Sequence, residues 1–206
     1  MGKHQLPKLS YEYDALEPYI DSKTMELHHS KHHQSYIDGL NNAKEKLSLA
    51  RKSGDFSLVK HYKKEIAFHG SGHMLHSIFW TNMGPSQEVK EKPEGELYDK
   101  IVEKYGDFET FWLEFKSTAT TIEGSGWAIL VVIEGELEIL SLEKHQNLFE
   151  MGAIPILVLD MWEHAFYLSY QNRKAEYLDA VYNVINWDDV EKRYLSAKNN
   201  SVLNFD

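Results

Sequence analysis

The chain contains no cysteine among its 206 residues. This absence excludes disulfide bonds, cysteine-ligated zinc, iron–sulfur clusters and thiol nucleophiles. Any metal site must therefore use nitrogen and oxygen ligands. Positive charge is also scarce, since 22 Lys and Arg stand against 32 Asp and Glu, a formal net charge of −10. That balance argues against nucleic-acid binding, which usually requires a basic surface.

Long hydrophobic runs are missing as well. The longest, residues 127–133, is far shorter than the roughly 20 residues of a membrane-spanning helix. The first residues contain no apolar segment like that of an export signal. We therefore expect no membrane partner and a cytoplasmic location. Hydrophobic residues still make up 42% of the chain, which is enough to form a sizeable core.

The first half of the chain has the pattern of a helical hairpin. Residues 22–51 are proline-free and rich in Glu, Lys, Leu and Ala, which predicts a long helix. Gly54 suits its C-terminal end, and Asp55 or Ser57 suits the N-cap of a second helix over about residues 57–82. Two long helices joined by so short a break predict an antiparallel hairpin. Two glycines inside the second helix predict close approach of another group: Gly70 and Gly72.

The second half mixes strands and helices. Residues 126–133 and 136–142 flank a Glu-Gly turn and predict a β-hairpin, and the apolar residues 155–160 predict a third, buried strand. Helices are expected over residues 96–104, 107–123, 163–172 and 174–197, the last broken near Trp187.

These elements predict an α+β fold. An N-terminal antiparallel helical hairpin is followed by a mixed domain, in which helices surround a small three-stranded antiparallel sheet. The charged segment 84–95, with two prolines, is the best candidate for a linker. We therefore expect an N-terminal domain over residues 1–90 and a C-terminal domain over residues 91–206.

Histidines carry the chemical information. Seven of the 11 fall in two short windows on the paired helices: His28, His29, His32, His33, His69, His73 and His76. Antiparallel packing can bring imidazoles from both helices into one pocket. Because histidine is the commonest metal ligand, this clustering indicates a metal-binding or proton-handling role. We expect His4 and His61 to be solvated.

Two familiar metal motifs do not match. A zinc protease needs Glu directly after the first His of His-x-x-x-His, and no Glu follows His28, His29 or His69. A di-iron bundle needs two Glu-x-x-His motifs, and the single match, which begins at Glu26, has no convincing partner.

A carboxylate ends the third apolar strand, and a histidine follows four residues later. Asp160 and His164 could each place a ligand in one cavity. With two helix histidines they would make three nitrogens and one carboxylate, a set that suits iron or manganese. The alternative is that Asp160 caps a helix and His164 lies on the surface of its first turn.

Seven segments carry recognisable motifs, namely, in chain order, residues 6–7, 13–18, 25–36, 76–80, 124–127, 160–167 and 183–187. Together these segments resemble the iron/manganese superoxide dismutases over nearly the whole chain. The most specific is the signature Asp-x-Trp-Glu-His-Ala, which stands here at residues 160–165.

The resemblance implies the metal site and the reaction. One iron or manganese ion would be bound by four side chains, His28, His76, Asp160 and His164. A solvent molecule would be the fifth ligand. Two superoxide anions and two protons would become dioxygen and hydrogen peroxide, while the metal alternates between its trivalent and divalent states.

It also implies roles for residues around the metal. Tyr36 and His32 would line the entry and relay protons. His145 would hydrogen-bond the bound solvent and tune the redox potential, with Gln146 as the alternative one residue along. Many iron members have glutamine where this chain has Gly72, and some archaeal-type members have histidine at the place of His145, so iron, manganese or either could support activity. Three tryptophans would form the walls of the cavity: Trp80, Trp127 and Trp162.

An oligomer follows from the same resemblance. Glu163 would reach across a dimer interface to the ligand His164 of the other subunit, and Tyr167 would pair with His32 across it. We therefore expect a homodimer or a homotetramer whose assembly is tied to activity.

Two alternatives from other functional classes remain open. A mononuclear iron oxygenase would use two histidines and one carboxylate and would need a pocket for an organic co-substrate. A histidine-rich storage or scaffold protein would bind metal without turnover.

Overall fold

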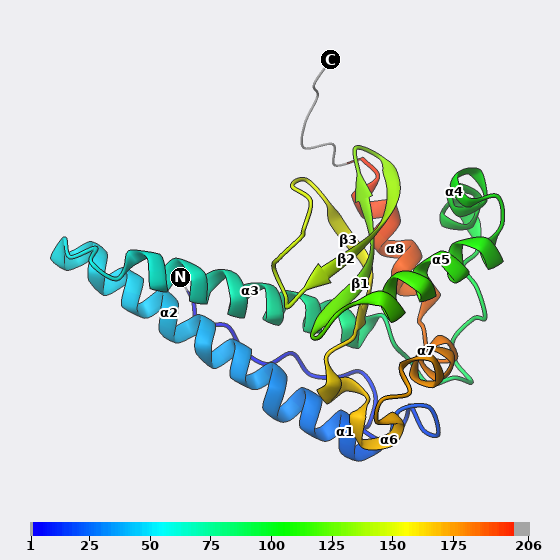
Figure 1. The fold of residues 1–206 in the computed structure, drawn as a ribbon, viewed down its shortest axis with the longest axis horizontal. Helices are drawn as coiled ribbons and strands as arrows, with labels where there is room; N and C mark the ends of the chain where they lie inside the picture. The colour runs from blue at the N-terminus through cyan, green and yellow to red at the C-terminus, as the bar shows by residue number, and fades with distance from the viewer. Residues whose placement is uncertain (1, 200–206) are drawn as a thin grey trace.

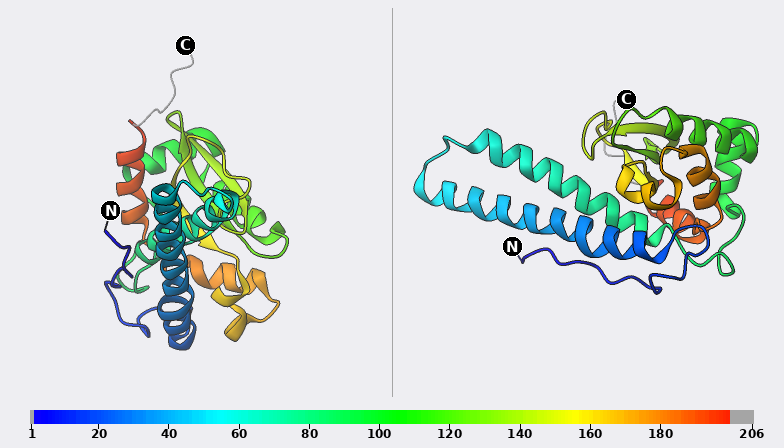
Figure 2. Two further views of the ribbon diagram at one scale, coloured as in Figure 1. Left: turned by 90° about the vertical axis from the view of Figure 1, so that its left-hand side faces the viewer. Right: turned by 60° about the horizontal axis from the view of Figure 1, so that its bottom comes forward.

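A computed structural model of the chain describes residues 2–199. An irregular N-terminal arm leads into α1 (Ser22–Leu27), the π-helical turn η1 (His28–His33) and α2 (Gln34–Ser53), which continue one another as a single rod (Figure 1). Helix α3 (Val59–Thr81) returns beside them. The predicted helical hairpin is therefore confirmed, and Figure 2 shows its far end projecting beyond the rest of the molecule.

Local capping explains both ends of the continuous helix formed by α1, η1 and α2. The side chain of Asp21 accepts a backbone N–H of the first turn and so caps α1. Gly54 ends α2 with a φ of 73°, the left-handed conformation expected of a C-terminal glycine. The predicted N-cap of the next helix is wrong. Helix α3 begins after Leu58 with no side-chain cap, and Asp55 instead accepts the backbone N–H of Ser57 within the turn.

A three-stranded antiparallel sheet forms the centre of the C-terminal half. Its strands are β1 (Gly126–Ile133), β2 (Glu136–Glu143) and β3 (Ile154–Asp160), in the order β2-β1-β3. Every residue of β1 except the last is buried, which accounts for its unbroken apolar sequence. The register pairs Trp127 with Asp160, so the end of β3 lies beside the start of β1.

Helices pack around this sheet, which confirms the predicted α+β class. Helices α4 (Gly95–Tyr105) and α5 (Phe108–Thr121) precede it, and α7 (Lys174–Tyr182) and α8 (Trp187–Ala197) follow it. The break between the last two helices falls just before Trp187, as expected. Within residues 2–199 no helix is both long enough and apolar enough to cross a membrane.

The segment after β3 differs from its prediction. In place of one helix over residues 163–172, the chain forms a short 3-10 turn, η2 (Glu163–Ala165), and the four-residue α6 (Tyr167–Tyr170). The backbone N–H of Trp162 donates to Asp160 Oδ1 at 2.8 Å, so Asp160 orders this turn instead of capping a regular helix.

The helical hairpin is bonded to the sheet where α3 ends. Asn82 Nδ2 donates to the carbonyl of Ile156 at 3.1 Å, and the N–H of Val158 donates to Asn82 Oδ1 at 2.9 Å. The buried amide thus pairs with β3 as a neighbouring peptide group would. Helix α3 and strand β3, which each carry a predicted metal ligand, are therefore held in a defined relation.

Candidate metal centre

Four elements each contribute one side chain to a buried cluster. His28 begins η1, His76 lies on α3, Asp160 ends β3 and His164 lies in η2. One potential ligand atom of each lies within 4.8 Å of the other three. His28, His76 and Asp160 are at most 1% exposed. The structure thus brings together the four residues that the resemblance implies as ligands.

The three imidazoles face one carboxylate oxygen. Asp160 Oδ2 lies 3.1 Å from His28 Nε2, 3.2 Å from His164 Nε2 and 3.6 Å from His76 Nε2. Within the described part of the chain, His28 Nε2 and His76 Nε2 are buried without a hydrogen bond of acceptable geometry. An unpaired buried polar group costs about 1–3 kcal/mol. A cation would satisfy both nitrogens and the carboxylate at once, and this donor set suits iron or manganese.

Hydrogen bonding and burial set the charge of these ligands. His76 Nδ1 donates to the carbonyl of Gly72 at 2.7 Å, so the proton is on Nδ1 and Nε2 presents a lone pair. Burial lowers the pKa of His76, and lowers that of His28 to about 4, so both rings are neutral at pH 7. Burial by itself would raise the pKa of Asp160, but the histidines around it, His164 foremost, hold that pKa well below its ordinary value. The cluster is therefore an anionic cavity with inward-facing lone pairs.

The π-helical turn η1 directs its histidines to different neighbours. An extra residue per turn changes the angular spacing of the side chains, and such turns often lie at functional sites. His28 faces the metal cluster, His29 faces the N-terminal arm and His33 faces α3. His32 stacks on His164 with 4.1 Å between ring centroids. A regular helix was expected here, and helical spacing alone did not predict this division.

Tyr36 and His145 lie against the cluster beside α3. The centroid of the Tyr36 ring is 5.0 Å from that of His76 and 4.5 Å from that of His145. Gly72 makes room for both rings, because a Cβ at this position would come within 3.0 Å of Tyr36 and 3.3 Å of His145. The close approach predicted from this glycine is thus observed. Burial raises the pKa of Tyr36, so its hydroxyl stays protonated.

Two tryptophans hold His145. Trp127 Nε1 donates to His145 Nδ1 at 3.0 Å, so the proton of the neutral ring is on Nε2. The ring stacks on Trp162 with 4.5 Å between centroids. Nε2 is buried and has no partner among residues 2–199, and burial lowers the pKa of His145 to about 4. His145 therefore offers an N–H donor, whereas Gln146 accepts the backbone N–H of His145 at 3.3 Å.

Glu163 and Tyr167 lie on the surface on either side of His164 in sequence. Tyr167 is 48% exposed, and Glu163 is exposed as well. His32 is half-buried between the cluster and solvent. In a single chain these three side chains can be reached by solvent, and they lie next to His164, which is itself only partly buried.

A hydrogen-bonded chain joins η1 directly to α3. Trp80 Nε1 donates to His33 Nδ1 at 2.9 Å, and His33 Nε2 donates to His73 Nδ1 at 2.8 Å. His33 is fully buried, and its ring stacks on His76 with 5.3 Å between centroids. The sequence motifs predict no separate role for either histidine. Both belong to the two histidine-rich windows, but their spacing along the helices does not distinguish a metal ligand from a histidine that only contacts one.

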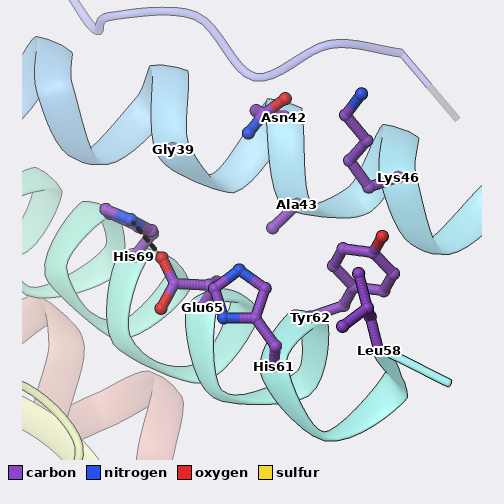
Figure 3. Close-up of a pocket in the computed structure, with 9 residues that line it drawn as sticks. All are labelled: Gly39, Asn42, Ala43, Lys46, Leu58, His61, Tyr62, Glu65 and His69. Atoms are coloured by element: carbon purple, nitrogen blue, oxygen red, sulfur yellow. Dashed lines mark ion pairs between the residues drawn. The ribbon is translucent and has the colours of Figure 1, made fainter.

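His69 does not join the metal cluster. Its Nε2 lies 3.4 Å from Glu65 Oε2, and its ring occupies the space beside Gly39, where a Cβ would come within 2.4 Å of it. It lines a pocket between α2 and α3 together with exposed His61 (Figure 3). None of the four clustered ligands lines this pocket, so it is separate from the candidate metal centre.

Comparison with known proteins matches both halves of the chain to one family. The model for the α-hairpin domain of iron/manganese superoxide dismutases matches residues 3–84, and that for their C-terminal domain matches residues 93–193. A probable iron superoxide dismutase of Bacillus subtilis (strain 168) is 50% identical over 200 residues, which are 96% of this chain and 70% of that protein.

Relatives named for manganese, or for both metals, match a similar share of the chain. A manganese/iron superoxide dismutase of Propionibacterium freudenreichii subsp. shermanii is 47% identical over 95% of this chain and 98% of its own. A manganese superoxide dismutase of Mycolicibacterium smegmatis is 45% identical over 96% of this chain and 95% of its own.

Proposed function

This chain belongs to the iron/manganese superoxide dismutases, and we propose that the cluster around Asp160 is the metal centre of its superoxide dismutase activity. The reaction converts two superoxide anions and two protons into dioxygen and hydrogen peroxide. The proposal rests on three histidine nitrogens that converge on one buried oxygen of Asp160. Two of these nitrogens, on His28 and His76, have no hydrogen bond among the described residues.

One ion of iron or manganese per chain would be held by His28, His76, Asp160 and His164. When bound, such an ion supplies a one-electron redox couple, so that one superoxide can be oxidised and the next reduced. The ionised Asp160 offsets part of the positive charge of the ion. Relatives are named for iron, for manganese and for both, so either ion is a candidate here.

Reduction of superoxide to hydrogen peroxide consumes two protons, and two groups of this chain are placed to handle them. His145 presents its Nε2–H without a partner in the described chain, and Tyr36 keeps its hydroxyl proton at neutral pH. Both side chains can donate hydrogen bonds to a small anion or solvent molecule beside the ligands. Half-buried His32, stacked on His164, provides the connection to bulk solvent.

Tryptophan rings exclude water from this site. Trp127 is fully buried and Trp80 nearly so, and Trp162 covers the ring of His145. Removing water lowers the local dielectric constant, which strengthens every electrostatic interaction of Asp160 and its neighbours. These rings also exclude bulky molecules, and an organic co-substrate is what the oxygenase alternative requires.

We further propose that the chain forms a homodimer or homotetramer through Glu163, His164, His32 and Tyr167. Glu163 and Tyr167 lie exposed beside the half-buried His32 and His164, where a second copy could pair with them. Glu163→Ala should weaken self-association and lower activity together, while Glu176→Ala, on the surface of α7, should change neither. Sedimentation velocity at several concentrations measures the assembly.

Two sequence expectations stay predictions. The division into domains 1–90 and 91–206 is tested by expressing each part separately and measuring cooperative unfolding. The cytoplasmic location is tested by fractionation of the cells that produce the protein.

The decisive experiment is to refill the apoprotein separately with iron and with manganese and to assay superoxide dismutation. Activity with one metal would show that the surroundings of His145 and Gly72 select that ion, and activity with both would show a tolerant centre. Full metal uptake without activity would refute the proposal and favour an oxygenase or a storage protein. His76→Ala serves as the control that lacks one ligand nitrogen.

A further inference from the structure

We propose that the N-terminal arm, residues 4–13, is a tie that holds the helical elements carrying His28 and His76 in register for the metal. The inference rests on the proposed assignment of these two histidines as ligands. It adds positioning residues that lie outside the cluster, namely Tyr11 and Tyr13.

The first attachment is to the residue next to His28. His29 Nε2 donates to the carbonyl of Pro7 at 2.8 Å, and the Tyr13 hydroxyl donates to His29 Nδ1 at 3.1 Å. A carbonyl can only accept, so a neutral ring with its proton on Nε2 satisfies both contacts. His29 is 7% exposed, and the arm uses both of its ring nitrogens. A rotation of η1 that displaced His28 would also displace the adjacent His29 ring and disturb both bonds.

The second attachment is to α3, one turn beyond His76. The Tyr11 hydroxyl donates to the carbonyl of Trp80 at 2.9 Å. Trp80 lies in the last turn of α3, where carbonyls lack partners within the helix, so this bond satisfies one that would otherwise be free. The Trp80 ring lies 4.8 Å from that of His28. Burial raises the pKa of Tyr11, which keeps its hydroxyl a donor.

The third attachment fastens the start of the arm to α2. The N–H of His4 donates to Asn41 Oδ1 at 2.9 Å, and Asn41 Nδ2 donates to the carbonyl of His4 at 3.0 Å. Lys44 Nζ also donates to His4 Nε2 at 2.6 Å. The expectation that His4 is simply solvated is therefore wrong, because it is half-buried against α2. The arm runs along the hairpin between these attachments (Figures 1 and 2).

Tyr11 and Tyr13 are separated by one residue, yet they bond to the two different elements that carry the ligands. The rings of His28 and His76 lie only 5.0 Å apart, and the bonds of His33 to Trp80 and His73 join the same elements directly. Ligands must be held to within about 0.5 Å to bind a metal well. A tie from the arm limits sliding between η1 and α3 that those direct bonds alone would allow.

The test compares phenylalanine variants, which keep the ring and remove only the hydroxyl. Tyr11→Phe, Tyr13→Phe and the double variant are loaded with iron and challenged with excess chelator, and the rate of metal release is measured. Tyr182→Phe is the matched control, because its hydroxyl donates to the carbonyl of Glu91 at 2.8 Å and neither residue belongs to the metal cluster. The electron paramagnetic resonance spectrum of the iron(III) form reports ligand geometry independently of activity.

Loss of one hydrogen bond should speed metal release by about fivefold. We expect this increase in the rate of metal release for each single variant. The double variant should release metal faster still and show an altered resonance spectrum. Tyr182→Phe should release metal at a rate within about twofold of wild type. A double variant that matches the control in both readouts would overturn the tie, whatever its thermal stability. An unmodified chain that takes up no metal would overturn the ligand assignment and the tie together.

Discussion

Replacing Gly72 by alanine would add one methyl group where α3 packs against Tyr36 and His145, the two residues beside the metal cluster. The new Cβ would lie 3.0 Å from two ring atoms of Tyr36 and 3.3 Å from Cδ2 of His145. Ordinary carbon contacts lie at about 3.5–4.0 Å, so both rings must move by several tenths of an ångström. Gly70, two residues earlier, is a matched control, because a Cβ there would meet only Leu40, at 3.5 Å.

The two substitutions should therefore differ in their effect on stability. Alanine in a helix interior is favoured over glycine by about 1 kcal/mol, and Gly70→Ala should gain most of it. Gly72→Ala gains the same amount but loses about 1–3 kcal/mol to overpacking. The expected difference between the variants is about 1–3 kcal/mol. In a protein of this size, 1 kcal/mol corresponds to about 2–4 °C in the unfolding temperature.

Activity should separate the variants further. Tyr36 and His145 are the proposed proton-handling groups, and small misplacements of reacting groups are costly. We expect Gly72→Ala to lower dismutation per bound metal by about three- to tenfold, and Gly70→Ala to leave it unchanged.

Stability is best measured by thermal unfolding of the apoproteins, because bound metal adds its own contribution to stability. Activity is measured on the reloaded proteins and divided by metal content. The reasoning would be refuted if Gly72→Ala were as stable and as active as Gly70→Ala. That result would mean that the two rings adapt without cost and that Gly72 is not required for space.

His76→Ala removes a ligand nitrogen and should reduce bound metal and dismutation to background, as metal analysis beside an activity assay would show. The apoprotein should keep its full stability above about pH 6.5 and lose stability as the pH falls towards 4. In that range histidines of the unfolded chain bind protons, whereas buried His28 and His145, with pKa values of about 4, stay neutral in the folded chain. The slope is about 1.4 kcal/mol per pH unit for each histidine, and urea titrations showing a flat profile would contradict it. Trp127→Phe removes the indole N–H that donates to His145 Nδ1. It should lower the free energy of unfolding, measured by urea denaturation, by about 1–3 kcal/mol.

Most of the fold could be predicted because its signals are local. The Gly54 helix end, the Glu-Gly turn between β1 and β2 and the apolar run of β1 each act within a few residues. The errors fall where distant segments decide the conformation. The π-helical turn is bordered by the arm, α3 and β3, and none of these contacts is visible in the sequence around His28. The irregular chain after β3 is ordered by the carboxylate of Asp160.

The chemistry of the site divides in the same way. The absence of cysteine already restricts any metal to nitrogen and oxygen ligands, and the histidines and Asp160 stand in recognisable motifs. Which histidines face Asp160, and which nitrogen of each ring is free, depends on how the chain folds. Those choices depend on hydrogen-bond partners such as the carbonyl of Pro7 or the indole of Trp127, which are brought to each ring from remote positions in the chain. A ring nitrogen becomes available to a metal when folding occupies the other one.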